Sequence, residues 1–438
     1  MTTAILPPPA AANTSGEQVE GPAIDIESGT PESVVTQYVA HAVGAGASDL
    51  FFASHATHIA VQMRHLGIVR SIGALPLDLG RRAIAHIKAN AGIDTAEKRR
   101  PLDGRWKLDL TASGRAVKRG AGGVAIGVDL RINFIPTLYG EDVALRLVRR
   151  DNRLAGLESL GMADEQLSAY RAMLESPSGL ILITGPTGAG KTSTLYASLL
   201  RIRDAAGGTR KINTIEDPVE YAIDGLRQSQ VNPQINLGFA ELLRSILRQG
   251  PDVIMIGEVR DPETAETAIR AANSGVLVFA TLHAPSAPAA VQSMRSLGGL
   301  PYFLASSLCG VVAQRLVRTL CPDCRTSFDL SDAPHTFDEV SPMLPTAGGK
   351  RLFAASGCPA CGMTGYAGRT GVFEVMPITS ALRTLIADGR PSREIRDKAV
   401  AQGMLEFRQA ALLKVAQGES STEELFRVIP TENLVLDD

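Results

Sequence analysis

A glycine-rich loop that ends in a lysine and hydroxyl residues lies near the middle of this 438-residue chain. It follows the apolar run 180–184 and has the pattern G-x-x-x-x-G-K-S/T. Its residues are Gly185, Pro186, Thr187, Gly188, Ala189, Gly190, Lys191, Thr192 and Ser193. In this pattern backbone N–H groups surround a triphosphate, the lysine reaches the β- and γ-phosphates, and the next hydroxyl binds Mg²⁺. A strand before the loop and a helix after it are the required context, so the sequence predicts binding of ATP and Mg²⁺, with Thr192 as a metal ligand.

Three later apolar runs end in polar groups suited to a phosphoryl-transfer site, two in carboxylates and one in a histidine placed to report the γ-phosphate to the neighbouring segment. One run is followed by acidic residues that extend to Glu220, the next by Gly-Glu at Glu258, and the third by His283. Transfer from ATP to water needs carboxylates that hold the metal and orient the water. Because the carboxyl ends of parallel strands face one crevice, these side chains can converge on the phosphates. Each acidic group alone also fits a solvated strand end, and His283 alone also fits a structural role.

Four of the five cysteines form two Cys-x-x-Cys pairs. The pairs are Cys321 with Cys324 and Cys358 with Cys361. In a reducing compartment this spacing favours a metal over disulfides, and four thiolates suit a tetrahedral Zn²⁺ with no open position. The sequence therefore predicts a structural zinc site. The alternative for the same residues is four free or redox-active cysteines.

The overall composition is that of an ordinary globular protein. Hydrophobic residues make up 45% of the chain and charged residues 21%, and the net charge is −2. Aromatic residues make up only 5%, which with near neutrality argues against a nucleic-acid channel lined by basic and stacking side chains. No apolar run is long enough to span a membrane, and the N-terminus lacks the features of a secretory signal. We therefore expect a cytoplasmic protein.

The elements that must position these residues group into two domains. Residues 1–33 are rich in Pro, Ala and acidic residues, and they predict a disordered tail. Residues 34–150 mix short strands with helices and predict a small α+β domain, followed by a linker at 151–163. From 164 to 438 apolar strands alternate with helices, which is typical of an α/β fold with a mostly parallel sheet. This domain contains two further parts, the zinc-binding insert 321–366 and a helical C-terminal part 381–438.

Together these segments resemble the GspE/PulE/PilB family of ATPases, which serve type II secretion and type IV pilus assembly. In that family the phosphate loop is followed by an acidic box, a Gly-Glu Walker B strand and a histidine box. These boxes match residues 214–220, 254–261 and 275–283. The resemblance implies a RecA-like P-loop NTPase domain. It also implies that Glu220 is the base or water-orienting carboxylate and that Glu258 holds Mg²⁺ through water.

The α+β domain resembles the family's second N-terminal domain, in which arginines reach the nucleotide of a neighbouring subunit. The matching positions are Arg105, Arg131 and Arg146. Isolated arginines are otherwise most often surface residues. The resemblance implies a homo-hexamer that is cytoplasmic and peripherally associated with the inner membrane, where it meets the platform and docking proteins of a secretion or pilus system. The pilus-retraction branch usually lacks the cysteine insert, which favours a secretion or pilus-extension motor.

Two other functions stay open on these residues. A RecA-like nucleic-acid translocation motor would share the phosphate loop, but the near-neutral composition does not favour it, and no nucleic acid is expected. A nucleotide-gated scaffold would bind ATP with little hydrolysis, but it would not need both Glu220 and Glu258. The sequence favours an ATP-hydrolysing motor for pseudopilus or pilus assembly.

Overall fold

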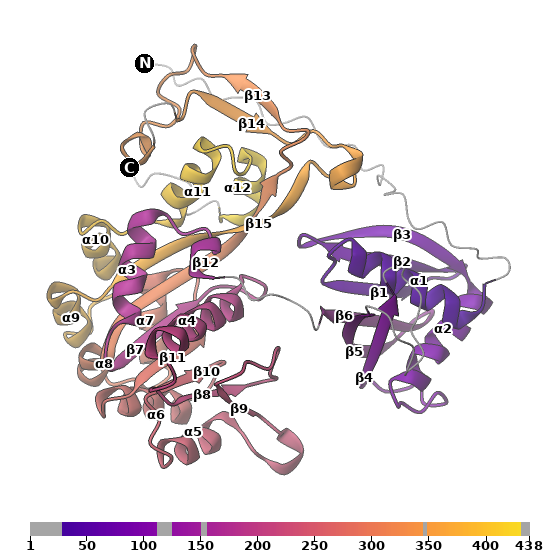
Figure 1. Cartoon of the computed structure of the whole chain (residues 1–438), viewed down its shortest axis with the longest axis horizontal. Helices are drawn as coiled ribbons and strands as arrows, with labels where there is room; N and C mark the ends of the chain where they lie inside the picture. Colours follow the sequence, from indigo (N-terminus) through magenta and orange to yellow (C-terminus); the bar gives the residue numbers. More distant parts are fainter. Residues whose placement is uncertain (1–28, 112–124, 150–155, 345–347, 431–438) are drawn as a thin grey trace. The chain divides into compact units, whose positions relative to one another are not determined.

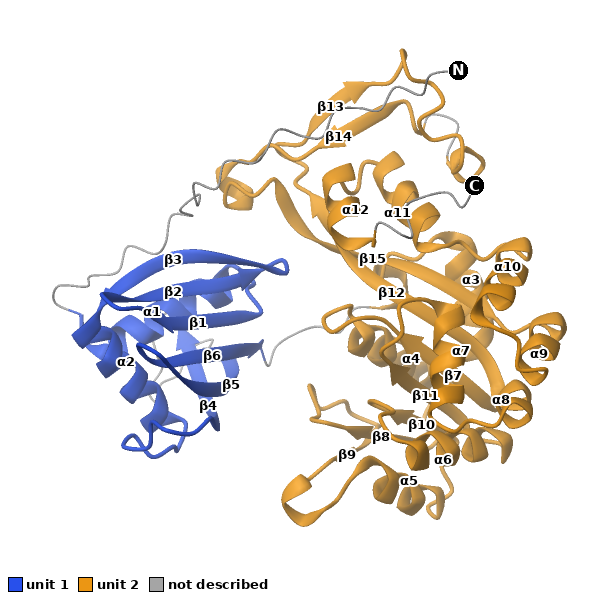
Figure 2. Cartoon of the chain, turned by 180° about the vertical axis from the view of Figure 1, so that it is seen from behind, with its two compact units in different colours: residues 1–151 blue, residues 152–438 orange. Residues whose placement is uncertain are grey.

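The computed structural model describes residues 29–111, 125–149, 156–344 and 348–430. The chain divides into two compact units, Met1–Asp151 and Asn152–Asp438 (Figure 2). Most of the tail expected at residues 1–33 lies outside the described ranges. The two units are described separately below.

Unit 1 contains a six-stranded antiparallel sheet with two helices packed on one face among its described residues (Figure 1). The strands lie in the order β3-β2-β1-β6-β5-β4. Alternate side chains of β1, Leu50 and Phe52, enter a core that also holds Val39 of α1 and Ile84 of α2. This alternation is what a sheet covered on one face requires. The elements are α1 (Pro31–Gly44), β1 (Asp49–Ser54), β2 (His58–His65), β3 (Ile68–Pro76), α2 (Leu77–Asn90), β4 (Leu102–Thr111), β5 (Ala125–Thr137) and β6 (Gly140–Arg149).

Unit 2 is built on a seven-stranded sheet in the order β15-β12-β7-β11-β10-β8-β9 among its described residues. Neighbouring strands run parallel except β12 and β15, which pair antiparallel. The sheet is buried on both faces, because Leu180 and Leu182 of β7 enter one core while Ile181 and Ile183 enter another. The expected α/β fold is confirmed. The strands are β7 (Gly179–Thr184), β8 (Ile212–Glu216), β9 (Arg227–Gln230), β10 (Val253–Ile256), β11 (Leu277–Leu282), β12 (Leu308–Leu320) and β15 (Tyr366–Pro377).

Helices cover both faces of this sheet (Figure 1). Tyr170 of α3 and Leu195 of α4 pack in the core of one face, and Leu243 of α5, Val291 of α7 and Phe407 of α11 pack in the core of the other. The four last helices form the C-terminal part. The helices are α3 (Asp164–Leu174), α4 (Lys191–Ala206), α5 (Phe239–Leu247), α6 (Pro262–Asn273), α7 (Ala287–Ser296), α8 (Pro301–Ser307), α9 (Ser380–Ala387), α10 (Ser392–Ala401), α11 (Phe407–Ala416) and α12 (Thr422–Val428).

The cysteine insert lies between β12 and β15 in the sequence and contains a small sheet of β13 (Thr326–Asp329) and β14 (Arg351–Ala354). Two features depart from the sequence analysis. The strands β12 and β15 flank the insert, although neither was expected, because β12 passes from an apolar start to a charged end and lacks a uniform period. Leu157 and Leu160, in the segment expected as a linker, are buried in the core of unit 2.

Candidate active site

The glycine-rich loop joins the end of β7 to the start of α4. Gly190 precedes the first residue of α4 in a left-handed conformation, with φ of 89°. A Cβ atom on Gly185 would lie 2.3 Å from the carbonyl oxygen of Gln314 on β12. The amide Nε2 of Gln314 donates to the carbonyl of Ala189 at 2.7 Å. The loop is therefore fixed by glycine conformation and by β12, and its N–H groups lie at the positive end of α4.

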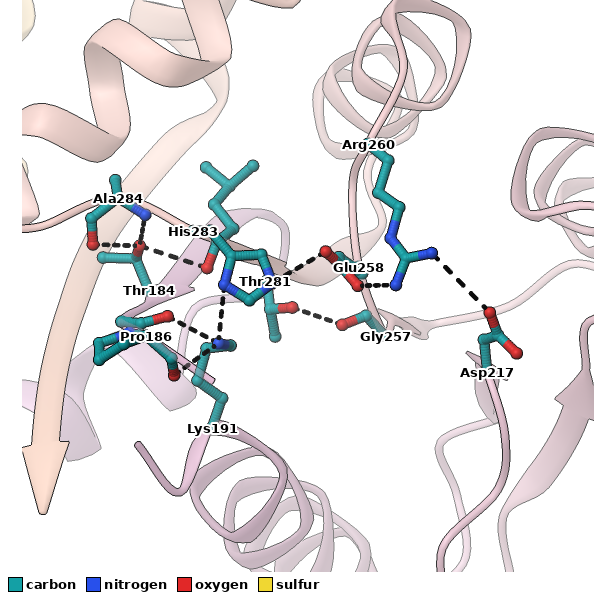
Figure 3. Close-up of polar contacts among 12 residues, drawn as sticks. Thr184, Pro186, Lys191, Asp217, Gly257, Glu258, Arg260, Thr281, His283 and Ala284 are labelled. Atoms are coloured by element: carbon teal, nitrogen blue, oxygen red, sulfur yellow. Dashed lines mark hydrogen bonds and ion pairs between the residues drawn. The ribbon is translucent and has the colours of Figure 1, made fainter. Parts of the chain in front are cut away.

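Lys191, the first residue of α4, turns back over this loop (Figure 3). Its Nζ donates to the carbonyl oxygens of Gly185 at 2.7 Å and Pro186 at 3.2 Å, and lies 3.5 Å from Nδ1 of His283. Burial lowers the pKa of Lys191, and the negative charge of Glu258 opposes this shift. The ammonium group thus occupies the mouth of the loop, where carbonyl dipoles take the place that phosphate oxygens would have.

Glu258 contacts both His283 and Arg260 (Figure 3). Its Oε1 lies 2.9 Å from Nε2 of His283, and its Oε2 lies 2.5 Å from Nη2 of Arg260. Burial raises the pKa of Glu258, but hydrogen bonds and charges from Arg260 and His283 outweigh burial, so the pKa lies below its ordinary value. Arg260 also reaches Asp217, with Nη1 4.0 Å from Oδ2. Polar contacts therefore run from the phosphate loop to the ends of β10 and β8.

A small cavity lies beside these groups, with a volume of about 90 Å³. Thr192, Glu220 and Glu258 contribute to its lining, so the structure brings the expected magnesium ligands and the expected catalytic carboxylate together. A cavity of this size admits water molecules. Mg²⁺ prefers oxygen ligands and keeps several of its waters, so the hydroxyl and carboxylate donors here fit it.

Glu216, at the end of β8, has a different role from its acidic neighbours. Its side chain is buried and accepts hydrogen bonds from the Tyr196 hydroxyl, from Thr214 Oγ1 at 2.5 Å and from Gln228 Nε2 at 3.0 Å. The same Tyr196 hydroxyl accepts the backbone N–H of Glu220 at 3.3 Å. Tyr196 thereby ties the buried Glu216 to the backbone of Glu220. Burial, and then the hydrogen bond to Glu216, raise the pKa of Tyr196, which keeps it protonated.

Three arginines expected to act on nucleotide form a row in unit 1. Arg105 on β4 is paired with Arg131 on β5, which is paired in turn with Arg146 on β6. All three line one hollow of about 450 Å³. Asp49 of β1 continues the row and lies 3.3 Å from Nε of Arg146. Like charges on directly opposed residues repel each other. Three guanidinium groups and the carboxylates of Asp49 and Asp103 line this hollow, so positive charge is in excess there and favours an anion.

The four paired cysteines meet at one point of the insert. Their sulfur atoms lie within 4.8 Å of one another, with separations of 3.9 Å for Cys321 and Cys358, 3.8 Å for Cys324 and Cys361, and 3.7 Å for Cys358 and Cys361. Zinc–sulfur bonds of 2.3 Å in a tetrahedron give sulfur separations of about 3.8 Å. The donor set and spacing therefore fit Zn²⁺.

Backbone N–H groups point at two of the four sulfur atoms in this cluster. The N–H of Gly357 points at Cys324 Sγ, and those of Cys358 and Gly365 point at Cys361 Sγ, each at 3.2 Å. Burial raises the pKa of Cys361, but these N–H groups and the neighbouring thiols outweigh burial and lower it to about 6. The pKa of Cys324 is instead raised, first by burial and then by its hydrogen bonds with the other three thiols. The surroundings therefore favour the thiolate at Cys361 and the protonated thiol at Cys324, and a metal that binds all four sulfur atoms has to displace that proton.

The chain matches a family model described as "Type II/IV secretion system protein" over residues 26–427. It belongs to this family. It is 39% identical over 403 residues to "Type II secretion system protein E" of Dickeya dadantii, and the aligned region covers 91% of this chain and 76% of that protein. It is 36% identical over 409 residues to "Type IV pilus assembly ATPase PilB" of Thermus thermophilus, and the aligned region covers 93% of this chain and 44% of that protein.

Solved structures show the same fold. The Legionella pneumophila ATPase DotB matches 93% of this chain and 98% of its own with a TM-score of 0.66 and 19% identity. The pilus retraction motor PilT with bound ADP matches 90% and 96% with a TM-score of 0.55 and 23% identity. The resemblance drawn from the sequence is confirmed, and the chain is an ATPase of the secretion and pilus-assembly class.

The structure places the predicted residues in three groups. In the first group Lys191 and Glu258 contact His283, and Thr192 and Glu220 share a cavity with Glu258. The second group is the three arginines that line a hollow in unit 1, and the third is the four cysteines. Sequence reasoning missed Arg260, Tyr196 and Gln314. Arg260 lies two positions after Glu258, which was an available signal. Nothing local indicated the other two, because their partners lie on other elements.

Proposed function

We propose that this ATPase is a homo-hexameric motor that drives pseudopilus or pilus assembly at the inner membrane. The main support for ATP hydrolysis is the contact of His283 with Lys191 and Glu258 at the phosphate loop. The cavity lined by Thr192 and Glu220 lies beside this contact. The names of its relatives supply the process, because they are a type II secretion protein and a type IV pilus assembly ATPase.

Each site residue has one task in this proposal. Lys191 exchanges its contacts with loop carbonyl groups for the β- and γ-phosphates of ATP. Thr192 and Glu258 would hold Mg²⁺, Glu258 through water, and the bound ion would neutralise charge on the transferred phosphoryl group. Glu220, whose backbone Tyr196 holds, orients the attacking water. The other residues of the loop 185–193 supply backbone N–H groups, which Pro186 lacks, and hydroxyls to the phosphates.

His283 suits a sensor of the γ-phosphate. Its two ring nitrogens face different partners, Lys191 on one side and Glu258 on the other. When Lys191 moves to a phosphate, this arrangement changes at once, because the ring loses one neighbour and keeps the other. A change in the His283 ring would then pass to the segment that follows it, which runs into α7.

The arginine row is the part of the proposal that requires a second subunit. Arg105, Arg131 and Arg146 belong to unit 1, whereas the phosphate loop belongs to unit 2. We propose that the anion these arginines bind is the triphosphate held by a neighbouring subunit. A contact between two different surfaces of neighbouring subunits forms a ring when its rotation closes, which accords with a hexamer. A guanidinium that reaches across an interface stabilises the charge that develops during transfer.

The remaining assignments concern zinc and the membrane. Cys321, Cys324, Cys358 and Cys361 would hold Zn²⁺ in a closed structural site. None of the helices in the described part of the chain has the length and apolarity that a bilayer crossing requires. We assign the chain to the cytoplasmic face of the inner membrane, where platform and docking proteins of a secretion or pilus system would bind it.

Phosphate release by the purified chain, compared with its Glu258→Gln variant, tests this function. Two results together support the motor: the parent releases phosphate from ATP and the variant does not, and light scattering gives the active particles the mass of a hexamer. Tight ATP binding without release by the parent would favour a nucleotide-gated scaffold. Release that single-stranded DNA stimulates would favour a nucleic-acid motor instead.

A further inference from the structure

Glu374 is a buried carboxylate that the nucleotide site does not use. It lies on β15 with 5% of its surface exposed. Its Oε2 accepts the backbone N–H of Ala287 at 2.8 Å, and its Oε1 accepts that of Phe407 at 3.2 Å. Ala287 is the first residue of α7, and Phe407 is the first residue of α11. One side chain therefore satisfies unpaired N–H groups of two helices from inside the protein.

Strand pairing aligns Glu374 with the phosphate loop. Glu374 is opposite Ala313 of β12, and Ala313 is opposite Thr184, the last residue of β7 before the loop. Directly paired residues project from the same face of a sheet. Thr184 Oγ1 accepts the N–H of Ala284 at 2.7 Å and donates to its carbonyl at 3.0 Å (Figure 3). The row Thr184–Ala313–Glu374 thus holds both ends of the short segment 284–287.

This segment begins directly after His283. The ring of His283 must lie between Lys191 and Glu258 for the contacts described above. The backbone on the C-terminal side of His283 is held first by Thr184 and then, at the start of α7, by Glu374. A loss of the second tie would free the start of α7 and loosen the backbone that sets the His283 ring.

The charge of Glu374 is costly where it lies. Burial raises its pKa to about 7, although the N–H groups of Ala287 and Phe407 lower it in part. The other charged groups that face it are Glu406, which raises the pKa, and Arg315 of β12, which lowers it. An ionised carboxylate has two full acceptor oxygens for two helix N-termini, whereas an amide has one. The ability to hold both helices at once therefore requires the ionised carboxylate.

We propose that Glu374 is a positioning residue for ATP hydrolysis, which fastens the start of α7, and with it the segment after His283, to the start of α11. The inference rests on the proposed role of His283 in turnover. It also means that a displacement of α11 and a displacement of the His283 segment are mechanically linked. The start of α11 and the segment that follows His283 are then linked through this carboxylate.

The test compares Glu374→Gln with a matched control, Glu424→Gln. Glu424 is fully buried in the same unit, but it pairs with Arg318 and Arg427 and does not touch the segment 284–287. We expect Glu374→Gln to lower kcat roughly tenfold with nearly unchanged ATP affinity, because a misplaced group slows chemistry more than binding. Hydrogen exchange should speed up in peptides that cover residues 284–290 and 405–410. Glu424→Gln should leave kcat and both peptides as in the parent.

The pH dependence gives a readout that a merely structural role would not move. Between pH 8 and pH 6 the parent carboxylate takes up a proton and loses one full acceptor. The protection of peptide 284–290, corrected for intrinsic exchange, should therefore fall as the pH is lowered in the parent and stay flat in Glu374→Gln. If the Gln variant does not fold, Glu374→Asp is read in its place, because its shorter side chain cannot reach both helices.

The outcomes separate this inference from the proposed function. Unchanged exchange at 284–290 in the Glu374 variant overturns the inference, whatever its turnover. A loss of turnover without faster exchange there, or an equal loss in Glu424→Gln, overturns it as well. A parent chain that releases no phosphate refutes the proposed function, and it refutes the hydrolytic role of Glu374 with it. Faster exchange and lower kcat in the Glu374 variant alone support the inference.

Discussion

The cysteine cluster and the phosphate loop are the two proposed ligand sites of unit 2, and they are preorganised to different degrees. In the cluster the sulfur atoms already stand 3.7 to 3.9 Å apart, with N–H groups directed at them. In the loop Lys191 contacts carbonyl groups of its own backbone, and Glu258 is shared between Arg260 and His283. The proposed zinc site would need only an ion, whereas the proposed nucleotide site would have to exchange contacts that it already has.

This difference matches what each site has to do. A structural site gains stability from contacts that never change, so permanent geometry serves it best. A turnover site must accept and release its ligand repeatedly, so its internal contacts must be replaceable by those of the ligand. Lys191 has carbonyl partners in the free loop and phosphate partners in the proposed complex, which prevents a half-buried cation from losing all of its partners between cycles.

The largest effect is expected at the cysteines. Replacement of Cys321 and Cys324 together by serine should remove zinc and cost on the order of 10 kcal/mol of local folding free energy, because the site barely exists in the unfolded chain. Metal analysis and limited proteolysis of the insert measure both. Cys309→Ser, outside the cluster, is the control and should keep the metal. A native preparation without zinc would remove the preorganised half of the comparison.

The next largest effect is expected at the phosphate loop. Lys191→Ala should abolish ATP binding and turnover, since it removes the ammonium group that lies at the mouth of the loop. Glu258→Gln should keep ATP binding and lower hydrolysis by roughly 10³-fold, because the loop is intact and the metal loses its carboxylate. Equilibrium binding and phosphate release separate the two variants. Hydrolysis at the parental rate by the Gln variant would refute the assignment of Glu258.

The parts that could be predicted from the sequence are those whose geometry is local. The phosphate loop and both cysteine pairs depend on residues a few positions apart, so their spacing alone indicates their chemistry. The α/β fold followed from continuous apolar runs, because strands buried on both faces carry them. The strands β12 and β15 were missed, since their period changes along their length.

Contacts between distant strands could not be predicted. Gln314 holds the phosphate loop from β12, and the alignment of Glu374 with Thr184 depends on the register of three strands. The arginines were recognised only by resemblance to a family. Their direct opposition on β4, β5 and β6 became visible only in the pairing of the strands. Register is set by packing of the whole sheet, which no single segment encodes.

A smaller loss is expected at the arginine row, which tests whether the phosphate site is incomplete within one chain. Arg131→Ala should lower hydrolysis by roughly 10²- to 10³-fold and leave nucleotide binding nearly unchanged, as expected for a group that acts on the developing charge. Arg64→Ala is the control, because Arg64 also pairs with Asp49 but lies outside the hollow. Specific activity of the parent should rise steeply with chain concentration. Full activity in a demonstrably monomeric sample would exclude a shared site.

The smallest effect is expected at Tyr196, the part of the phosphate site that most resembles the cysteine cluster in its fixed contacts. Tyr196→Phe removes the hydroxyl between Glu216 and the backbone of Glu220, and it should lower kcat by roughly tenfold while ATP affinity stays the same. The unfolding free energy should fall by about 1 to 3 kcal/mol, because buried partners lose a hydrogen bond. Tyr170→Phe is the matched control, since its buried hydroxyl bonds Ser198, away from the acidic residues, and should cost stability without slowing hydrolysis. Equal kcat values in the two variants would show that Glu220 needs no fixed support, and the distinction between a rigid frame and exchangeable ligand contacts would then fail inside the phosphate site itself.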